Sequence, residues 1–180
     1  MKSAARLACL LAGLILGAGI PVIAPAPALP VAQAGFRPYL NARFGYRIDY
    51  PADFIPQGES DNGDGQVFLG QDGAELRVWG GYNIFQETPA SALQEELQRS
   101  RENQRRVTYQ AVGRDFFVVS GYEPVRVSGA EPFGQRIFYL KTVVRPSLQA
   151  GFEFVYPASR RERYDRDVEA IARSLRLADP

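Results

Sequence analysis

The chain has 180 residues, with no histidine and a single cysteine, Cys9. A domain without imidazole and thiolate lacks the usual proton shuttle near neutral pH, the commonest nitrogen ligand of metals and the strongest side-chain nucleophile. The 21 basic residues nearly balance the 20 acidic ones, which argues against a protein that binds nucleic acid by neutralising its phosphates.

The first 34 residues have the pattern of a secretory signal peptide with a Pro/Ala-rich tail. Lys2 and Arg6 precede an uncharged, mostly apolar run over residues 7–20. That run is shorter than the ~20 apolar residues that a membrane-spanning helix needs. We therefore expect export to the periplasm or secretion, with no stable membrane insertion after cleavage.

The cleavage site is predicted after Ala34. Ala32 and Ala34 are the small residues that signal peptidase requires, and cleavage there leaves Gly35 at the new N-terminus. The alternative is an uncleaved anchor. Since Cys9 leaves with the leader, residues 35–180 are expected to form one domain that depends on its core and not on disulfides.

The first predicted strand covers residues 44–50. Its aromatic and aliphatic side chains alternate with Gly45, Arg47 and Asp49, and Pro51 ends it. This period of two is typical of a strand with one buried face.

A Gly/Asp-rich loop at residues 60–65 is followed by a predicted hairpin, with strands over 66–70 and 74–80 joined at Asp72-Gly73. A two-residue connection places Leu69 opposite Leu76 and Val67 opposite Val78, so that these four side chains share one face. Trp79 is then expected on the other face.

The next segment, from residue 88, predicts a helix at the edge of the domain. Thr88 is suited to cap it, Pro89 to occupy its first position, and the arginines between 99 and 106 to complement the dipole at its end. Its inner stripe is narrow and consists of Leu93, Leu97, Ser100 and Gln104.

The remaining sequence predicts an antiparallel run and a closing helix. Strands are expected over 107–112, 116–122, 137–140 and 152–156. The closing helix is predicted to begin at a capping box formed by Ser159 and Glu162. Its buried face is expected to consist of Tyr164, Val168, Ile171 and Leu175.

This order of elements resembles the PsbP-like fold family, which includes the PsbP subunit of the oxygen-evolving complex and exported bacterial proteins of the DcrB type. The residues that carry the resemblance are 44–51, 62–65 with Phe68, 119–122 and the closing helix. It implies an α+β fold in which helices flank an antiparallel sheet, an α/β/α sandwich. It also implies a mainly non-enzymatic accessory or assembly role. No functional residue of the family can be matched to a position in this chain.

A calcium site is a weak candidate in the loop, where Asp61, Asn62 and Asp64 offer oxygen ligands. When Ser60 is aligned with the first position of a calcium loop, Gln71 stands where a bidentate glutamate belongs, and a strand follows in place of a helix. A plain turn is therefore favoured, and no metal or cofactor is expected.

Two catalytic arrangements are also weighed. Ser120 and Lys141 suggest a nucleophile and a base, but Ser120 lacks an elbow motif such as G-x-S-x-G. The acidic residues Glu75, Glu123 and Glu153 suggest a carboxylate-dependent hydrolase acting on envelope glycans. Alternation along strands explains isolated acidic residues equally well, and we expect no catalytic residue.

The recognition element that we favour is Trp79-Gly80-Gly81-Tyr82 with Phe85 close behind. Trp79, Tyr82 and Phe85 offer aromatic surface, and the two glycines allow a partner to approach the backbone. Burial in the core is the alternative role for Trp79. We therefore expect a non-catalytic accessory or binding protein that engages an envelope protein or a small ligand.

Overall fold

The computed structural model describes residues 34–124 and 135–177, which lie in one compact unit, Val31–Pro180. The predicted leader lies outside the described residues, except for Ala34. Both helices and all the strands that were predicted are present, and the expected α+β architecture with antiparallel sheets is confirmed.

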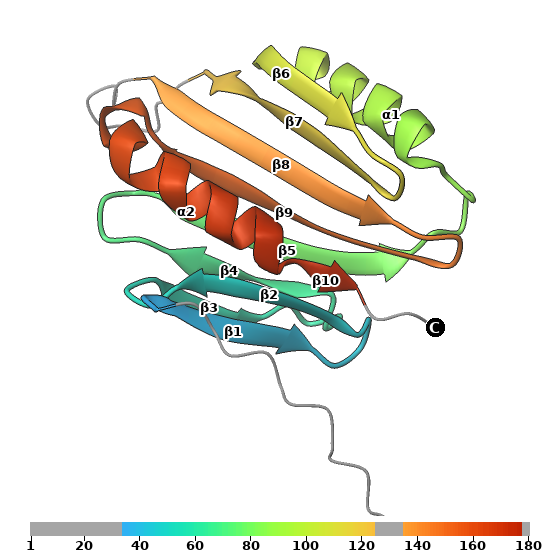
Figure 1. The fold of residues 1–180 in the computed structure, drawn as a ribbon, viewed down its shortest axis with the longest axis horizontal. Coiled ribbons are helices and arrows are strands. Elements are labelled where there is room, and N and C mark those ends of the chain that lie inside the picture. Colours follow the sequence, from blue (N-terminus) through green and yellow to red (C-terminus); the bar gives the residue numbers. More distant parts are fainter. Residues whose placement is uncertain (1–33, 125–134, 178–180) are drawn as a thin grey trace, which may run out of the picture. The chain divides into compact units, whose positions relative to one another are not determined.

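The centre of the fold is an antiparallel sheet of seven strands, in the order β3-β4-β5-β9-β8-β7-β6 (Figure 1). Its strands are β3 (Ile55–Glu59), β4 (Gly65–Leu69), β5 (Glu75–Tyr82), β6 (Arg106–Val112), β7 (Phe116–Glu123), β8 (Arg136–Val144) and β9 (Leu148–Pro157). The long β8 and β9 lie in its interior, and most of their side chains on both faces are buried.

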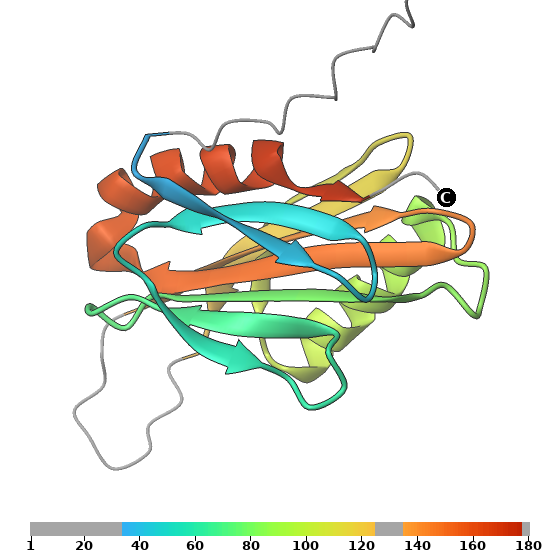
Figure 2. The ribbon, with the colours of Figure 1, turned by 90° about the horizontal axis from the view of Figure 1, so that it is seen from below.

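Two layers cover the opposite faces of this sheet. One contains α2 (Arg161–Ser174) and a three-stranded sheet of β1 (Phe36–Asn41), β2 (Tyr46–Pro51) and β10 (Arg176–Leu177). Among the described residues, the other layer contains α1 (Pro89–Glu102), which packs on β6 and β7. Figure 2 shows the two helices on opposite sides of the sheet. The sequence did not predict that β2 belongs to a separate small sheet.

The face toward α2, which we call the α2 face, carries the larger core. Tyr164, Val168, Ile171 and Leu175 are buried there, as the spacing along the closing helix predicts. They pack with aromatic rings of the two sheets, among them Phe54, Phe68, Phe152, Phe154 and Tyr156. Phe154 and Tyr164, for example, make an edge-to-face contact with ring centroids 5.2 Å apart.

The opposite face, the α1 face, carries a smaller core. Its buried members are Ala92, Leu93, Phe117, Val119, Phe138, Leu140, Val144 and Val155. Trp79 and Leu97 pack against this cluster while remaining partly exposed. The narrow apolar stripe of α1 explains why this helix covers only one end of the sheet.

The predicted register of the β4–β5 hairpin is wrong by one residue. Phe68 lies opposite Leu76, and Val67 lies opposite Arg77. The connection is a three-residue loop, because Gly70 N donates to Ala74 O at 2.8 Å and Gly73 takes a left-handed φ of 81°. A shift of one residue turns every side chain of a strand to the other face. Val67 and the 37% exposed Leu69 therefore share the face of Trp79.

The helix starts differ from each other. Thr88 caps α1 as predicted, since its side chain accepts from Ser91 N at 3.2 Å and the Ser91 hydroxyl accepts from Thr88 N at 2.9 Å. The capping box predicted at Ser159 is absent. A 3₁₀ turn, Ala158–Arg160, continues directly from β9 into α2, and Arg160 at the cap position makes no side-chain capping bond.

No helix within residues 34–124 and 135–177 has the length and apolarity needed to cross a bilayer.

Candidate functional site

Two of the three predicted recognition residues meet at one hollow on the α1 face. Trp79 projects from β5 toward α1, and Phe85 follows on the segment that joins β5 to α1. Tyr82 lies on the opposite face of β5, where its ring contacts Phe44 edge-to-face at 5.3 Å. The alternation of side chains along a strand separates Trp79 from Tyr82.

This hollow, which we call the Trp79 pocket, has a volume of about 210 Å³. Aromatic rings and carboxyl groups dominate its lining, which consists of Trp79, Phe85, Glu87, Ala92, Glu95, Glu96, Arg99, Phe117, Thr142 and Gln149. Phe85 is 82% exposed, so one aromatic wall stands open to solvent. The pocket therefore combines apolar walls with a set of acceptors.

The segment from β5 to α1 is fixed by Asn83, which is buried. Its amide donates to Glu87 O and to Arg145 O, each at 2.9 Å, and its side-chain oxygen accepts from Glu87 N at 2.8 Å. These bonds anchor the backbone on both sides of Phe85. The aromatic wall and Glu87 are thus held in place without a ligand.

The carboxyl groups of the pocket differ in their partners. Arg99 contacts Glu95 at 3.0 Å and Glu96 at 3.3 Å. Glu87 forms no ion pair with any residue in the described part of the chain. Burial raises the pKa of Glu87, and the adjacent Glu95 carboxyl raises it further. Burial also raises the pKa of Glu96, which is 5% exposed, while Arg99 partly offsets this.

Thr142 contributes a hydroxyl to the wall of the pocket. The residue is 5% exposed, and its hydroxyl makes no hydrogen bond with residues 34–124 or 135–177. Gly151 lies beside it, and a Cβ there would come within 2.7 Å of the Trp79 ring and 2.8 Å of Thr142 Oγ1. Glycine at 151 thus leaves room for the indole to lie close to the Thr142 hydroxyl.

A second hollow adjoins Trp79 on the same side of β5. We call it the β3–β5 groove, and its volume is about 340 Å³. It is lined by Gln57, Gly58, Glu59, Ser60, Asp64, Gly65, Gln66, Val67, Arg77, Val78 and Trp79. Trp79 therefore lines both hollows, in the part of the α1 face that α1 leaves open.

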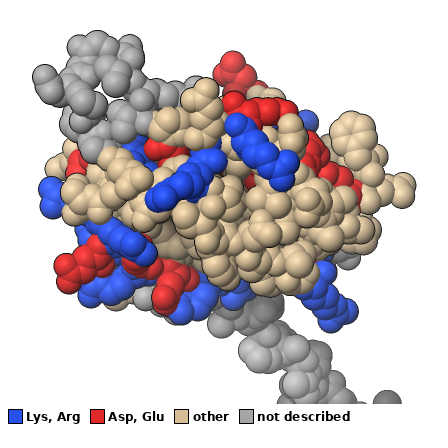
Figure 3. Space-filling view, turned by 90° about the horizontal axis from the view of Figure 1, so that it is seen from above, with Lys and Arg blue, Asp and Glu red and all other residues tan. Residues whose placement is uncertain are grey.

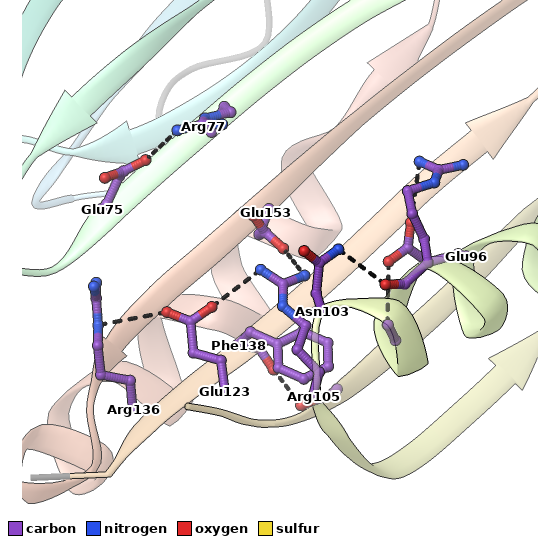
Figure 4. Close-up of polar contacts among 12 residues, drawn as sticks. Glu75, Arg77, Glu96, Asn103, Arg105, Glu123, Arg136, Phe138 and Glu153 are labelled. Carbon is purple, nitrogen blue, oxygen red and sulfur yellow. Dashed lines mark hydrogen bonds and ion pairs between the residues drawn. The ribbon is translucent and has the colours of Figure 1, made fainter. Parts of the chain in front are cut away.

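The acidic residues of the hydrolase hypothesis lie on the α1 face but are occupied by arginine (Figure 4). Arg105 contacts Glu123 at 3.0 Å and Glu153 at 2.5 Å, and its guanidinium lies 4.6 Å from the centre of the Phe138 ring. Glu75 lies apart on β5 and pairs with Arg77 at 2.8 Å. All three carboxylates therefore form ion pairs with arginine. They are not arranged as the acid and base of a hydrolase, which would face a substrate cleft.

Ser120 and Lys141 are also bound within the structure. The Ser120 hydroxyl donates to Phe138 O at 2.8 Å. The Lys141 ammonium donates to Ala172 O at 2.7 Å, near the end of α2, and lies over the Phe116 ring. Burial lowers the pKa of Lys141, but neither side chain is bonded to the other.

The candidate calcium loop is closed by its own side chains. Ser60 Oγ donates to one Asp64 carboxylate oxygen at 2.5 Å, and Asn62 donates to the other at 2.8 Å. The Ser60 bond, followed by that of Asn62, lowers the pKa of Asp64 despite its partial desolvation. Within the described residues no group of three or more acidic residues, Asp61 included, is arranged to hold a metal ion. These contacts are those of a turn.

Charge is mixed on the side of the molecule seen from above. Figure 3 shows Lys and Arg side chains lying close to Asp and Glu side chains, with uncharged surface between the groups. Neither sign forms an extended area of its own in this view. On α1, Arg99 and Glu95 form a local pair of opposite charge.

Comparison with known proteins gives the fold a name. Cyanobacterial PsbP (CyanoP) from Synechocystis sp. PCC 6803, solved in solution, superposes with a TM-score of 0.58 at 14% sequence identity, covering 85% of this chain and 98% of that one. The chain has the PsbP-like fold.

Other comparisons add little to this PsbP-like assignment. A protein of Bacteroides thetaiotaomicron VPI-5482 aligns with a TM-score of 0.46 at 13% identity, covering 74% of this chain and 45% of that one. No protein-family model and no curated protein sequence matches the chain. At these identities, likeness to solved structures shows the fold alone.

Sequence reasoning found the aromatic half of the Trp79 pocket and missed its polar half. Glu87 follows Phe85 closely in sequence, whereas Glu95 and Glu96 lie in the middle of α1, and only the packing of this helix brings them to Trp79. Thr142 comes from β8 and carries no local signal.

Proposed function

We propose that this chain is an exported, non-catalytic accessory protein of the bacterial cell envelope that binds a partner protein or a small ligand on its α1 face. The observation that carries the proposal is the position of Trp79, which lines both the Trp79 pocket and the β3–β5 groove. Tryptophan is enriched where binding energy is concentrated, because it offers a large rigid surface with a polar N–H.

A non-catalytic role is supported by the contacts of the candidate catalytic side chains, which are bonded to other groups of the protein. The Ser120 hydroxyl and the Lys141 ammonium donate to backbone carbonyls, and Arg105 occupies Glu123 and Glu153. A nucleophile or a general base has to be available to a substrate. The PsbP-like fold agrees with this proposal, since that resemblance implies mainly non-enzymatic members.

Export is part of the proposal and is supported by the sequence of the leader. N-terminal sequencing of protein recovered from the periplasm or the medium tests it, with Gly35 expected as the first residue. Recovery of an intact Met1 would support the alternative of an uncleaved anchor.

The binding function is tested by capture of partners from envelope extracts with two matched variants. Phe85→Ala removes an aromatic side chain that is 82% exposed at the Trp79 pocket, and Tyr82→Ala removes one that is 59% exposed on the opposite face. Both changes should leave the fold intact. We expect Phe85→Ala to reduce capture of a stoichiometric partner at least tenfold, and Tyr82→Ala to leave it unchanged.

Equal capture by both variants would place the binding surface elsewhere. Turnover of peptidoglycan or model esters by the purified protein, abolished by a single carboxylate substitution, would contradict the proposal and support the hydrolase alternative.

A further inference from the structure

We propose that the Trp79 pocket binds an alkylammonium group, either on a free amine or on the lysyl side chain of a partner. This inference rests on the proposed binding function and names the chemistry that the pocket recognises.

The first argument is charge. Three carboxyl groups, those of Glu87, Glu95 and Glu96, line the pocket, and the only cation in the lining is Arg99. Arg99 is already held by Glu95 and Glu96. Glu87 stays without an ion pair among the residues described, next to the Glu95 carboxyl. A cation between Glu87 and Glu95 relieves the repulsion between like charges, whereas an anion increases it.

The second argument is the aromatic wall. Trp79 and Phe85 both line the pocket, and the face of an aromatic ring attracts a cation through its quadrupole, tryptophan most strongly. The methylene groups of an alkylammonium ligand also pack favourably on such rings. Aromatic rings combined with carboxylates therefore favour an organic cation over a hydrated inorganic one.

The third argument is independent of the acidic residues. Thr142 is more than nine-tenths buried, lines the pocket, and has a hydroxyl that no described residue satisfies. Its oxygen is not among the buried unsatisfied side-chain atoms of the described residues, so it is accessible from the pocket and can accept a hydrogen bond from a ligand there. The hydroxyl oxygen provides an acceptor on β8 for a ligand that enters beside Trp79.

The geometry favours an ammonium over a guanidinium. Acceptors approach the pocket from separate elements: Glu87 before α1, Glu95 on α1 and Thr142 on β8. An ammonium has three donors on one atom, whereas a guanidinium presents a planar fork suited to a single carboxylate. The volume of about 210 Å³ suits a small headgroup, since sites for drug-sized ligands span roughly 300–1,000 Å³.

The experiment uses the intrinsic fluorescence of the protein, because Trp79 is its one tryptophan. The purified protein is titrated with 1,4-diaminobutane, with N-acetyl-lysine methylamide, and with 1,4-butanediol as the uncharged control. We expect a saturable change in Trp79 emission with at least one of the amines and none with the diol. Tighter binding of the lysine derivative indicates a partner's lysyl side chain, and tighter binding of the diamine indicates a free amine.

Three variants test the assignment, with binding measured by calorimetry as well as fluorescence. The double variant Glu87→Gln/Glu95→Gln should weaken amine binding at least tenfold, and Thr142→Val should weaken it about threefold. Glu169→Gln, which alters an exposed carboxylate on α2, should leave the affinity unchanged. Melting curves of each variant establish that it is folded.

Several outcomes would overturn the inference. These are the lack of a saturable response to either amine, an equal response to the diol, unchanged affinity in the double variant, or a response to calcium ions alone. If amines fail to bind while partner capture still depends on Phe85, the ammonium site is wrong and the proposed binding function stands. If amines bind and capture does not depend on Phe85, the pocket is a small-ligand site and partner binding has to be sought elsewhere.

Discussion

The two faces of the seven-stranded sheet are built from different chemistry. The α2 face is covered mainly by aromatic and aliphatic side chains, and Tyr164, Phe154 and Ile171 are at most 1% exposed, although a hollow of about 270 Å³ lies between α2 and the strands beneath it. The α1 face is only partly covered, and it holds buried charges, two hollows and a partly exposed tryptophan. We infer that the α2 face supplies most of the stability of the fold, whereas the α1 face presents groups for binding.

The largest effect is expected from a charge in the closed face. Ile171→Asp places a carboxylate where the side chain is 0% exposed and packs among aromatic and aliphatic side chains. Deletion of a buried isoleucine side chain alone costs about 2–5 kcal/mol, and burial of an unpaired charge adds to this. We expect a loss of about 4 kcal/mol or more in the free energy of unfolding, measured by urea denaturation.

Glu169→Ala provides the control on the same helix, because its side chain is 70% exposed. Its effect should stay within about 0.5 kcal/mol. A folded Ile171→Asp protein with normal stability would show that α2 is not docked as described.

A smaller loss is expected from the charged core of the open face. Arg105→Met removes the cation that pairs Glu123 and Glu153, whose side chains are each 17% exposed. Removal of one partner from a buried ion pair leaves an uncompensated charge and costs about 3–5 kcal/mol; here that charge is chiefly Glu153, since Arg136 still contacts Glu123 at 3.8 Å. Because some solvent reaches this cluster, we expect about 2–4 kcal/mol at neutral pH, measured by urea denaturation.

The triple variant Arg105→Met/Glu123→Gln/Glu153→Gln tests the cause of that loss. When both carboxylates become neutral, most of the lost stability should return, because the cost lies in the unpaired charges. If the triple variant is as unstable as the single one, packing of Arg105 on Phe138 is the main contribution instead.

The sequence predicted those parts of the fold that depend on local patterns. The stripe of Tyr164, Val168 and Ile171 follows the helical period, and each of these residues is buried. The hairpin register failed because Asp72-Gly73 is compatible with loops of either two or three residues, and the choice depends on which face Phe68 has to bury. Loop length is set by the tertiary core, and a local pattern does not report it.

For the candidate site, the limit was distance along the chain. Trp79 and Phe85 were predicted because they are aromatic and lie close together in the sequence. Thr142 lies far along the chain, on β8, and comes near Trp79 only through the strand order β5-β9-β8 of the folded sheet. Tyr82 was grouped with Trp79 although alternation along β5 places it on the other face. Both errors concern the placement of side chains and not the type of element.

The helix starts on the two faces can be compared directly by removing one hydroxyl from each. Thr88→Ala deletes the cap of α1 and should cost about 1 kcal/mol. Ser159→Ala should change the stability by less than about 0.5 kcal/mol, because Ser159 lies within the 3₁₀ turn and does not cap α2. Denaturation midpoints of the two variants measure this difference. An equal loss of stability in both would show that Ser159 does cap α2.

The smallest effect concerns the pH dependence of the open face. Burial raises the pKa of Glu96 above its ordinary value of 4.5, so the folded protein binds more protons at this site than the unfolded chain does. Below about pH 4.5 the group is protonated in both states and contributes no difference. As the pH rises through the raised pKa of the folded state, stability is lost, by about 1.4 kcal/mol for each unit of difference in pKa.

Glu96→Gln removes this titration while its amide oxygen can still accept from the Ser100 hydroxyl. Relative to the unmodified protein, the variant should therefore gain stability between pH 4 and pH 7.5, as measured by urea unfolding across that range. Glu95→Gln is the matched control, since its side chain is 60% exposed and pairs with the same arginine. If Glu95→Gln gains as much stability as Glu96→Gln over this pH range, the cause is the charge balance around Arg99 and not the burial of Glu96.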